Sequence, residues 1–324
     1  MQKIFPRKLK KGDEIRVIAS ARSLSTLSED LKNTAIQNLE KLGFTVTFSK
    51  NCEEIDLLSS SSIKSRVSDL HDAFLDKNVK AILTVIGGFN SNQLLPFIDY
   101  EIIKNNPKIL CGYSDITALT NAITVKTGLV TYSGLHFSSF GKLTHIDYKF
   151  EYFEKCLSFE SSKSFTVNNS KLWTDGEKTI ENSGMQILKK GFAEGEIVGG
   201  NLCTLNLLQG TEFMPELENK ILFLEDDYEC QPENFDRDLQ SLLQQKGGNK
   251  IKAIVFGRFQ ITSNMTNEKL QFIVDTKQEL VNIPMLSNVD FGHTSPSITF
   301  PIGGTAKLRT GENTENIQLE IIKH

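Results

Sequence analysis

The sequence lacks the features that mark disulfide-rich, nucleic-acid-binding or membrane-spanning proteins. Its five cysteines are odd in number, scattered, and form no CxxC pair; they are Cys52, Cys111, Cys156, Cys203 and Cys230. This pattern is typical of reduced thiols and argues against a disulfide framework or a zinc site. The formal net charge of −4 argues against a nucleic-acid partner, because such proteins usually present a basic face. No apolar run approaches the roughly 20 residues that cross a bilayer.

Targeting and cofactor motifs are also absent. The first residues, MQKIFPRKLKKGDEIRV, include basic side chains but neither the apolar stretch nor the small-residue cleavage site of a secretory signal. No cluster of histidine, cysteine and carboxylate residues has metal-ligand spacing, and there is no P-loop or complete dinucleotide fingerprint. We therefore expect a cytoplasmic protein with no membrane partner, no metal and no cofactor.

What the chain does contain is the patterning of two α/β domains. It has 324 residues, of which 39% are hydrophobic and 23% charged, which suits a globular protein with two domains of ordinary size. In residues 1–141 short apolar runs alternate with amphipathic stretches, which predicts an N-terminal domain with an open parallel sheet and helices. The predicted strands of this part include residues 14–20, 44–48, 81–86 and 108–113.

The rest of the chain divides into a polar segment and a second patterned part. Residues 142–190 are polar and show no lasting periodicity, so we expect an irregular connecting segment or a functional loop. Residues 191–324 again alternate apolar runs and amphipathic stretches, which predicts a C-terminal α/β domain. Its apolar runs include GEIVGG, KILFLEDD, KAIVFGRF and PMLSNVDFG.

The segment KILCGYSDITALTNA places a serine between an apolar strand and an amphipathic helix. Such a sharp turn holds the Ser114 hydroxyl away from the backbone, and the helix N-terminus supplies free N–H groups. The N–H of Asp115 would then face the oxyanion of a tetrahedral intermediate. Ile116 stands where a full nucleophile elbow has its second glycine. By residue type alone, Ser114 and Asp115 could equally serve only as helix caps.

A second donor of this kind is expected in IGGFNSNQ, residues 86–93, which also joins a strand to a helix. Its paired glycines allow the backbone to approach a ligand closely, although they also suit a tight turn. Ligands of open α/β sheets bind beyond the carboxyl ends of the strands, so this loop and the Ser114 turn could share one crevice.

A serine nucleophile needs a base, and five histidines are present. His71 lies on a predicted helix, His145 in the polar segment and His324 at the end of the sequence, which leaves His136 and His293. His293 follows the apolar run PMLSNVDFG, a position at a strand end that suits catalysis.

The acid that orients such a base would come from the run LEDDYE, at the end of another apolar strand. Glu225 closes the strand, and Asp226 and Asp227 are its rivals. A solvated acidic turn is the structural alternative for all three.

Taken together, these motifs resemble the serine LD-carboxypeptidase family, and within it the branch of the microcin C immunity peptidases. The resemblance covers almost the whole chain. The matching stretches are IGGFNSNQLLP, CGYSDITALTNAI, GLVTYSGLHFSSFG, AEGEIVGGNLCTLNLLQGT, ILFLEDDYE and FGHTSP. It implies a catalytic triad of Ser114, Glu225 and His293, oxyanion donors at Gly88 and Asp115, an active site between the two domains, and a homodimer.

The resemblance also implies the substrate class. One branch cleaves the L,D bond before the terminal D-alanine of muramyl tetrapeptides, and the immunity branch cleaves the amide that joins an aminoacyl or peptidyl group to a nucleotide. NSNQLLP and the loop NSKLWTDG look like the immunity branch, whose tryptophan stacks on the base, although LWTDGEK lacks the aromatic run expected further along. Asn90, Trp173 and Asn201 are candidates for substrate binding, and Trp173 could instead anchor the loop.

The expected function is therefore metal-independent amide hydrolysis of a small peptide or an aminoacyl-nucleotide. Two other classes stay open. A thiol hydrolase could use a cysteine, although Cys111 lies in the strand before the turn. A non-catalytic sugar- or nucleotide-binding protein could retain the crevice without the chemistry.

Overall fold

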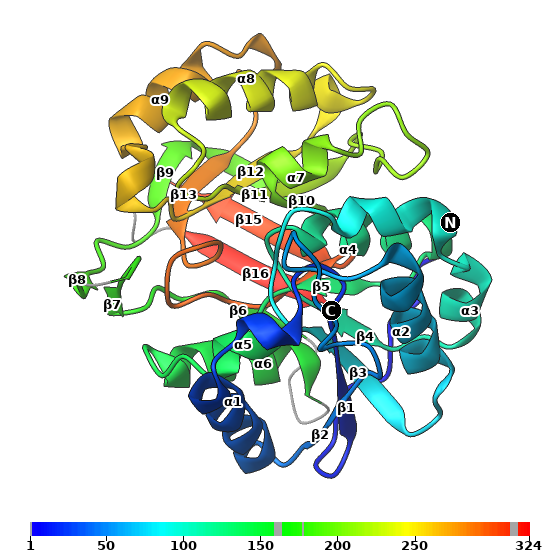
Figure 1. The fold of residues 1–324 in the computed structure, drawn as a ribbon. Coiled ribbons are helices and arrows are strands. Elements are labelled where there is room, and N and C mark those ends of the chain that lie inside the picture. The colour runs from blue at the N-terminus through cyan, green and yellow to red at the C-terminus, as the bar shows by residue number, and fades with distance from the viewer. Residues whose placement is uncertain (1, 159–163, 177, 312–316) are drawn as a thin grey trace.

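The computed structural model describes residues 2–158, 164–176, 178–311 and 317–324, and it consists of two α/β halves, each built on its own sheet (Figure 1). The N-terminal sheet has six strands in the order β14-β5-β4-β3-β1-β2. Its first five strands along the chain pair in parallel, and β14 adds an antiparallel edge. The strands are β1 (Glu14–Ile18), β2 (Thr45–Phe48), β3 (Val79–Thr84), β4 (Ile109–Cys111), β5 (Thr131–Ser133) and β14 (Phe300–Ile302).

Helices cover this sheet and connect its strands. Ser28 and Ser62 begin two of these helices, because each serine hydroxyl accepts a hydrogen bond from a first-turn N–H group. Gly128, in the left-handed conformation, ends a third. The α-helices are α1 (Glu29–Lys41), α2 (Ile63–Leu75), α3 (Tyr100–Asn105), α4 (Ile116–Thr127), α5 (Phe137–Phe140) and α6 (Ile146–Leu157), and the 3-10 helices are η1 (Leu24–Thr26) and η2 (Ser91–Phe97).

The C-terminal sheet has eight strands in the order β6-β16-β15-β10-β11-β12-β13-β9. Its centre, from β10 to β13, is parallel, and the outer strands are antiparallel. The strands are β6 (Phe165–Thr166), β9 (Gln186–Lys189), β10 (Gly191–Asn201), β11 (Lys220–Glu225), β12 (Ala253–Gly257), β13 (Met285–Val289), β15 (Thr305–Thr310) and β16 (Gln318–Lys323). Its helices are α7 (Leu202–Asn206), α8 (Pro232–Leu243), α9 (Asn267–Asp275), η3 (Gly248–Lys250), η4 (Ile261–Ser263) and η5 (Gln278–Leu280).

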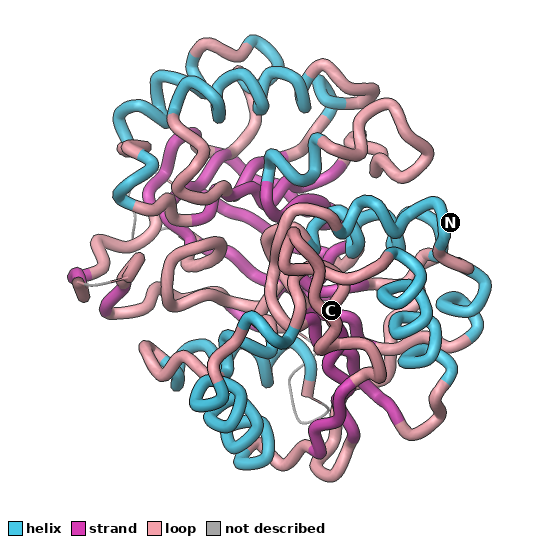
Figure 2. The backbone as a smooth tube through the Cα atoms, viewed as in Figure 1, coloured by secondary structure: helices cyan, strands magenta, loops and turns pink. Residues whose placement is uncertain are grey.

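The predicted fold class, two α/β halves with a parallel sheet, is confirmed, but the prediction for residues 142–190 needs correction. Figure 2 shows helix and strand within this segment. It contains α6, β6 and β9, together with a separate two-stranded ribbon of β7 (Leu172–Trp173) and β8 (Ile180–Glu181). Aromatic side chains bury one face of α6 in the N-terminal core, which stabilises a helix whose aromatic residues have modest helix propensity. Residues 159–163 and 177 of the segment lie outside the described residues.

Helix α4 joins the two halves, because it packs on both β10 and α7. Asn121 of α4 exchanges hydrogen bonds with the backbone of Gly199, at 2.9 Å and 3.4 Å. The N–H of Asn201 donates to the Thr117 hydroxyl at 3.0 Å. A Cβ on Gly200 would lie 2.5 Å from that hydroxyl oxygen. The helix therefore lies against bare backbone, which fixes the N-terminus of α4 relative to the end of β10.

We expect Gly199→Ala to destabilise the protein strongly. Gly199 has a φ of +136°, and a Cβ there would lie 2.0 Å from the carbonyl oxygen of Phe223 on the neighbouring strand. Backbone strain and overpacking together should reduce the free energy of unfolding by about 3 kcal/mol or more. Chemical denaturation measures the change.

The matched control is Gly210→Ala, because Gly210 also has a positive φ, +75°, but no heavy atom within 4 Å of the added Cβ. It should cost about 1 kcal/mol, from backbone strain alone. Equal losses in the two variants would contradict the close approach of β10 and β11.

Candidate active site

Ser114 lies at a strained turn between β4 and α4. Its φ of +61° is in the left-handed region that side chains other than glycine seldom adopt. Gly112 makes the turn possible, because a Cβ at this position would lie 2.3 Å from the Thr84 hydroxyl oxygen. Ile116, buried beside Gly112, occupies the place of the second glycine of a full nucleophile elbow. The turn projects the Ser114 hydroxyl from the end of the sheet, as the sequence pattern predicts.

Glu225 and His293 come from the C-terminal half and meet Ser114 at the junction. The His293 Nε2 atom lies 3.0 Å from the Ser114 Oγ, and the His293 Nδ1 atom lies 2.7 Å from the Glu225 Oε2. Glu225 is the last residue of β11, and His293 follows β13, the next strand but one in the sheet. Three side chains far apart in the sequence therefore form one continuous hydrogen-bonded chain.

Two glycines allow the backbone to close around the Glu225 carboxylate. A Cβ on Gly292 would lie 2.6 Å from the Glu225 Oε2, and one on Gly257 would lie 2.9 Å from the Glu225 Cβ. The Glu225 side chain is 3% exposed, so its charge needs a partner, and the imidazole of His293 supplies it.

The surrounding carboxylates control the pKa of His293. Burial alone would lower this pKa, but the charge of Glu225 and its hydrogen bond outweigh burial and raise the pKa above its usual 6.5. Asp227 and Asp226 act in the same direction. A raised pKa makes the imidazole a stronger base than a free histidine, which suits proton transfer near neutral pH.

Asp226 and Asp227, the other candidates for the orienting acid, make hydrogen bonds elsewhere. The Asp226 carboxylate accepts hydrogen bonds from the Asn201 side chain at 3.1 Å and from the Cys203 N–H at 3.2 Å. Burial and the neighbouring charge of Glu225 raise the pKa of Asp226 to about 6. Asp227 accepts from the N–H of Glu229 at 2.9 Å. Of the acidic run, Glu225 is the residue that the structure brings to His293.

His136, the other candidate base, is buried beneath the Ser114 turn. It stacks on Tyr113 with ring centroids 4.2 Å apart, and its Nε2 atom lies 3.1 Å from the Tyr113 nitrogen. Burial lowers the pKa of His136 to about 3, so the ring stays neutral at physiological pH. His136 therefore supports the turn, a role that its sequence context did not reveal.

Gly88 and Asp115, the predicted oxyanion donors, lie in the same part of the structure as Ser114. Both line one cavity of about 360 Å³ together with Ser114. Within the described residues, no protein acceptor takes the backbone N–H of either residue. The chain before Gly88 lies close to the nucleophile, because a Cβ on Gly87 would be 3.0 Å from the Ser114 Oγ. Backbone N–H groups without a protein acceptor, in the cavity that the nucleophile lines, are available to a bound ligand.

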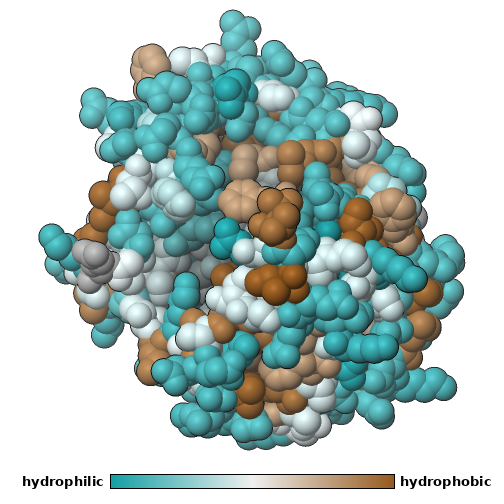
Figure 3. All heavy atoms as spheres, viewed as in Figure 1, coloured by the Kyte–Doolittle hydropathy of each residue, from teal (hydrophilic) through white to brown (hydrophobic). Residues whose placement is uncertain are grey.

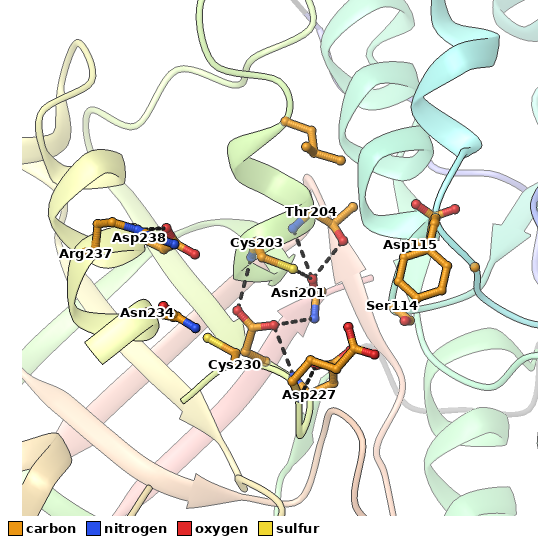
Figure 4. Close-up of a pocket in the computed structure, with 15 residues that line it drawn as sticks. Ser114, Asp115, Asn201, Cys203, Thr204, Asp227, Cys230, Asn234, Arg237 and Asp238 are labelled. Atoms are coloured by element: carbon orange, nitrogen blue, oxygen red, sulfur yellow. Dashed lines mark hydrogen bonds and ion pairs between the residues drawn. The ribbon is translucent and has the colours of Figure 1, made fainter. Parts of the chain in front are cut away.

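The cavity opens between the two halves, beside Ser114. Figure 4 shows Ser114 and Asp115 on one side of it and side chains of α7 and α8 on the other. Figure 3, viewed as in Figure 1, shows apolar residues gathered in the middle of the molecular face, on a largely hydrophilic surface. Phe89 and Leu207 are exposed apolar side chains that line the cavity.

A second cavity, of about 430 Å³, lies beside His293. Lys142 and Lys149 line it, as do hydroxyl-bearing residues such as Thr174 and Ser295. Burial and the nearby charge of Lys142 lower the pKa of Lys149 to about 8. The two lysines had no signal in the sequence, because they lie in the segment predicted to be irregular.

The structure places two of the three candidate substrate-binding residues in structural contacts. Asn90 accepts a hydrogen bond from Arg66 through its side-chain oxygen at 3.1 Å, and it does not line the cavity beside Ser114. Asn201 lines that cavity but caps α7, because its side-chain oxygen accepts from the Thr204 N–H at 3.1 Å. The only sequence signal for a buried role of Arg66 is its position as a charged residue on the apolar face of α2, between Ile63 and Leu70.

Trp173 lies outside the cavities that Ser114 and His293 line. Its ring centroid is 4.9 Å from the Arg258 guanidinium, and both residues line a third cavity of about 540 Å³. The next residue, Thr174, forms a pair of 2.7 Å backbone hydrogen bonds with Ser295. Trp173 is thus joined to the His293 loop through its neighbour.

The described residues contain no group of three or more histidine, cysteine or carboxylate side chains that could hold a metal ion. Burial, followed by the neighbouring Cys156, raises the pKa of Cys111 well above its usual value, which disfavours the thiolate that a thiol hydrolase needs. None of the helices in this part of the chain is both long and apolar enough to span a bilayer.

Solved structures share this architecture, and known proteins are similar in sequence over nearly the whole chain. An MccF-like protein from Bacillus anthracis, known from a crystal structure, is 50% identical, with a TM-score of 0.96 over 99% of this chain and 100% of that one. The microcin C7 self-immunity protein MccF of Escherichia coli is 32% identical over 95% of this chain and 93% of its own length. Its structure with aspartyl sulfamoyl adenosine gives a TM-score of 0.89 over 99% of each chain, at 30% identity.

A Bacillus subtilis relative named "Probable murein peptide carboxypeptidase" is 34% identical over 97% of this chain and 94% of its own length. Residues 15–134 match the LD-carboxypeptidase N-terminal domain, and residues 194–308 match the LD-carboxypeptidase C-terminal domain. These two domain matches, with sequence identity over nearly the whole chain, show that the protein belongs to the LD-carboxypeptidase family of serine-type peptidases.

Proposed function

We propose that the protein hydrolyses amide bonds through a triad in which Ser114 is the nucleophile, His293 the base and Glu225 the orienting acid. The observation that carries this proposal is the hydrogen-bonded chain of 3.0 Å and 2.7 Å that joins the three side chains. A nucleophile and base within hydrogen-bond reach, with the base held by a third group, are the recurring geometry of serine hydrolysis.

The proposed reaction begins when His293 takes the Ser114 proton and the hydroxyl oxygen attacks the substrate carbonyl. The N–H groups of Gly88 and Asp115 stabilise the oxyanion, and each such donor is worth about 10²–10³ in rate. The imidazolium, paired with Glu225, then protonates the leaving nitrogen. Water, activated by His293, hydrolyses the acyl-enzyme and regenerates Ser114.

The two cavities beside the triad support separate binding places for the acyl group and the leaving group of the substrate. His293 must reach the leaving nitrogen, so the leaving group belongs in the cavity that His293 lines and the acyl group in the cavity on the Ser114 side. The leaving-group cavity carries Lys142 and Lys149, which suits an anion. The acyl cavity contains carboxylates, including Asp227 and Glu229, which suits an ammonium group.

We infer that aminoacyl- or peptidyl-nucleotide amides are the substrate class. An aminoacyl-nucleotide carries an α-ammonium group on its acyl side and a phosphate on its leaving side, which matches the charges of the two cavities. The related MccF binds aspartyl sulfamoyl adenosine, a molecule of this shape. Muramyl tetrapeptides are the second candidate, because a relative is named as a murein peptide carboxypeptidase and a D-alanine leaving group also carries an anionic charge.

We expect Ser114→Ala and His293→Ala each to remove nearly all hydrolysis, and the double variant to lose little more. Members of a triad act as a unit, so their effects do not add. Ser25→Ala is the control and should keep the activity, because the Ser25 hydroxyl donates to the Glu53 carbonyl and Ser25 lines neither cavity beside the triad. The measurement is kcat/KM on an aminoacyl-nucleotide and on a muramyl tetrapeptide. Near-wild-type turnover by Ser114→Ala would rule out the mechanism.

The pH profile tests the role of Glu225. The base works as neutral imidazole, so kcat/KM should fall as pH drops through the His293 pKa, which lies above 6.5. Glu225→Gln removes the largest of the effects that raise this pKa but leaves the burial that lowers it, so the inflection should move to lower pH. NMR titration of the imidazole signals measures the same shift without turnover, and His136 should show no titration above pH 5. An unchanged His293 pKa in Glu225→Gln would contradict this assignment.

Trp173→Ala tests whether the protein recognises the base of a nucleotide substrate. One face of the partly buried Trp173 ring lies against Arg258. We propose that the base of the substrate extends beyond the His293 cavity, past Thr174 at its wall, and stacks on the other face of the Trp173 ring. Stacking is worth roughly 1–3 kcal/mol, so its loss should lower kcat/KM for the aminoacyl-nucleotide by about one to two orders of magnitude. The tetrapeptide has no base, and its hydrolysis should barely change. Equal losses on both substrates would show that Trp173 only anchors its loop.

A further inference from the structure

Two buried groups of opposite charge hold the loop that follows β3. Arg66 on α2 is 2% exposed, and Asp115 at the start of α4 is 3% exposed. Between them lies the peptide unit that joins Asn90 to Ser91. Its carbonyl oxygen accepts from the Arg66 Nη1 at 3.0 Å, and its N–H donates to the Asp115 Oδ2 at 2.9 Å.

This arrangement follows the dipole of the peptide. The negative end of the peptide, its oxygen, faces the cation, and the positive end, its N–H, faces the anion, so both charges favour one orientation of the unit. Two further contacts fix the same loop. The N–H of Asn90 donates to the Asp115 carboxylate at 3.1 Å, and the Ser91 hydroxyl donates to the Asp115 carbonyl at 2.6 Å.

Burying a guanidinium is unfavourable unless hydrogen bonds replace its hydration. Arg66 obtains these bonds from loops that meet at the carboxyl edge of the N-terminal sheet. Its Nε donates to the Ser61 carbonyl at 3.0 Å, its Nη2 to the Gln93 side chain at 2.9 Å, and its Nη1 to the Asn90 side chain at 3.1 Å. A charge placed under this loop therefore restrains it from several directions.

The clamped peptide lies two residues after Gly88, and the chain at Gly87 and Gly88 packs closely against its neighbours. A Cβ on Gly87 would touch Ser114, and one on Gly88 would lie 3.0 Å from the Ala21 Cβ. A displacement of about 1 Å at a catalytic donor can cost about 10²-fold in rate.

We propose that Arg66 and the carboxylate of Asp115 are positioning residues that clamp the Asn90–Ser91 peptide and thereby hold the Gly88 N–H against the oxyanion site of Ser114. This inference rests on the proposed function. It assigns Asp115 two separate tasks, one for its N–H group and one for its side chain.

The test is Arg66→Met, which keeps the length and the apolar stem but removes the charge. The oxyanion contact strengthens in the transition state, so kcat should fall about 10- to 100-fold while KM stays within about twofold. The rate at which a fluorophosphonate labels Ser114 should fall with kcat, because the phosphoryl oxygen uses the same N–H groups. Circular dichroism confirms that the variants compared are folded at the assay temperature.

Lys108→Met is the matched control. Lys108 is another buried cation of the same sheet, but it lies at the opposite edge, where its Nζ donates to the carbonyl oxygens of Ala73, at 3.0 Å, and Asp76. Its loss should lower stability and leave kcat and the labelling rate unchanged. A kcat for Arg66→Met within threefold of wild type, or an equal fall in Lys108→Met, would overturn the clamp.

Asp115→Asn provides a second route if Arg66→Met does not fold. The amide keeps an acceptor oxygen and the backbone N–H but loses the charge, so kcat should fall about 10-fold at unchanged KM. Wild-type kcat in this variant would also overturn the inference. A wild-type protein that hydrolyses neither substrate and is not labelled at Ser114 would instead overturn the proposed function, and the clamp with it.

Discussion

The close contact between helix α4 and strand β10 is the constraint on which the site depends. Ser114 stands at the N-terminus of α4, and Glu225 ends β11, the strand next to β10. Gly199 and Gly200 expose bare backbone, against which Thr117 and the rest of α4 can pack. Because this contact fixes helix and sheet relative to one another, a side chain from each half can meet within hydrogen-bond distance.

Buried charged side chains with compensating partners are a second recurring feature of the structure. Glu225 is compensated by His293, and Arg66 and Asp115 are compensated by the backbone of the loop that they hold. The hydrogen bond with Glu225 also orients His293 towards Ser114, and the hydrogen bonds of Arg66 and Asp115 also fix the loop that follows β3. Stabilisation and positioning are thus provided by the same contacts, so changes at these residues should affect geometry as well as stability.

The chain pattern predicted most of the fold. Apolar strands such as KILFLE and AIVFG lie where the alternation places them, because fully buried parallel strands are apolar on both faces. Helix α6 was missed. Its buried residues Tyr152, Phe153, Cys156 and Leu157 do follow helical spacing, but aromatic residues favour helices weakly and polar stretches flank them. Packing against the N-terminal core, rather than propensity, stabilises this helix.

The sequence by itself determined which residues stand at strand ends, and with the family resemblance it identified Ser114, Glu225 and His293 as a candidate triad. Only the tertiary structure decided that Glu225, rather than Asp226, contacts His293, that Arg66 restrains Asn90, and that two cavities of different charge flank the nucleophile. The physical reason is the range of the interactions involved. Strands and helices follow from side chains a few residues apart, whereas these contacts join segments far apart in the chain, and only the packing of one half on the other brings them together.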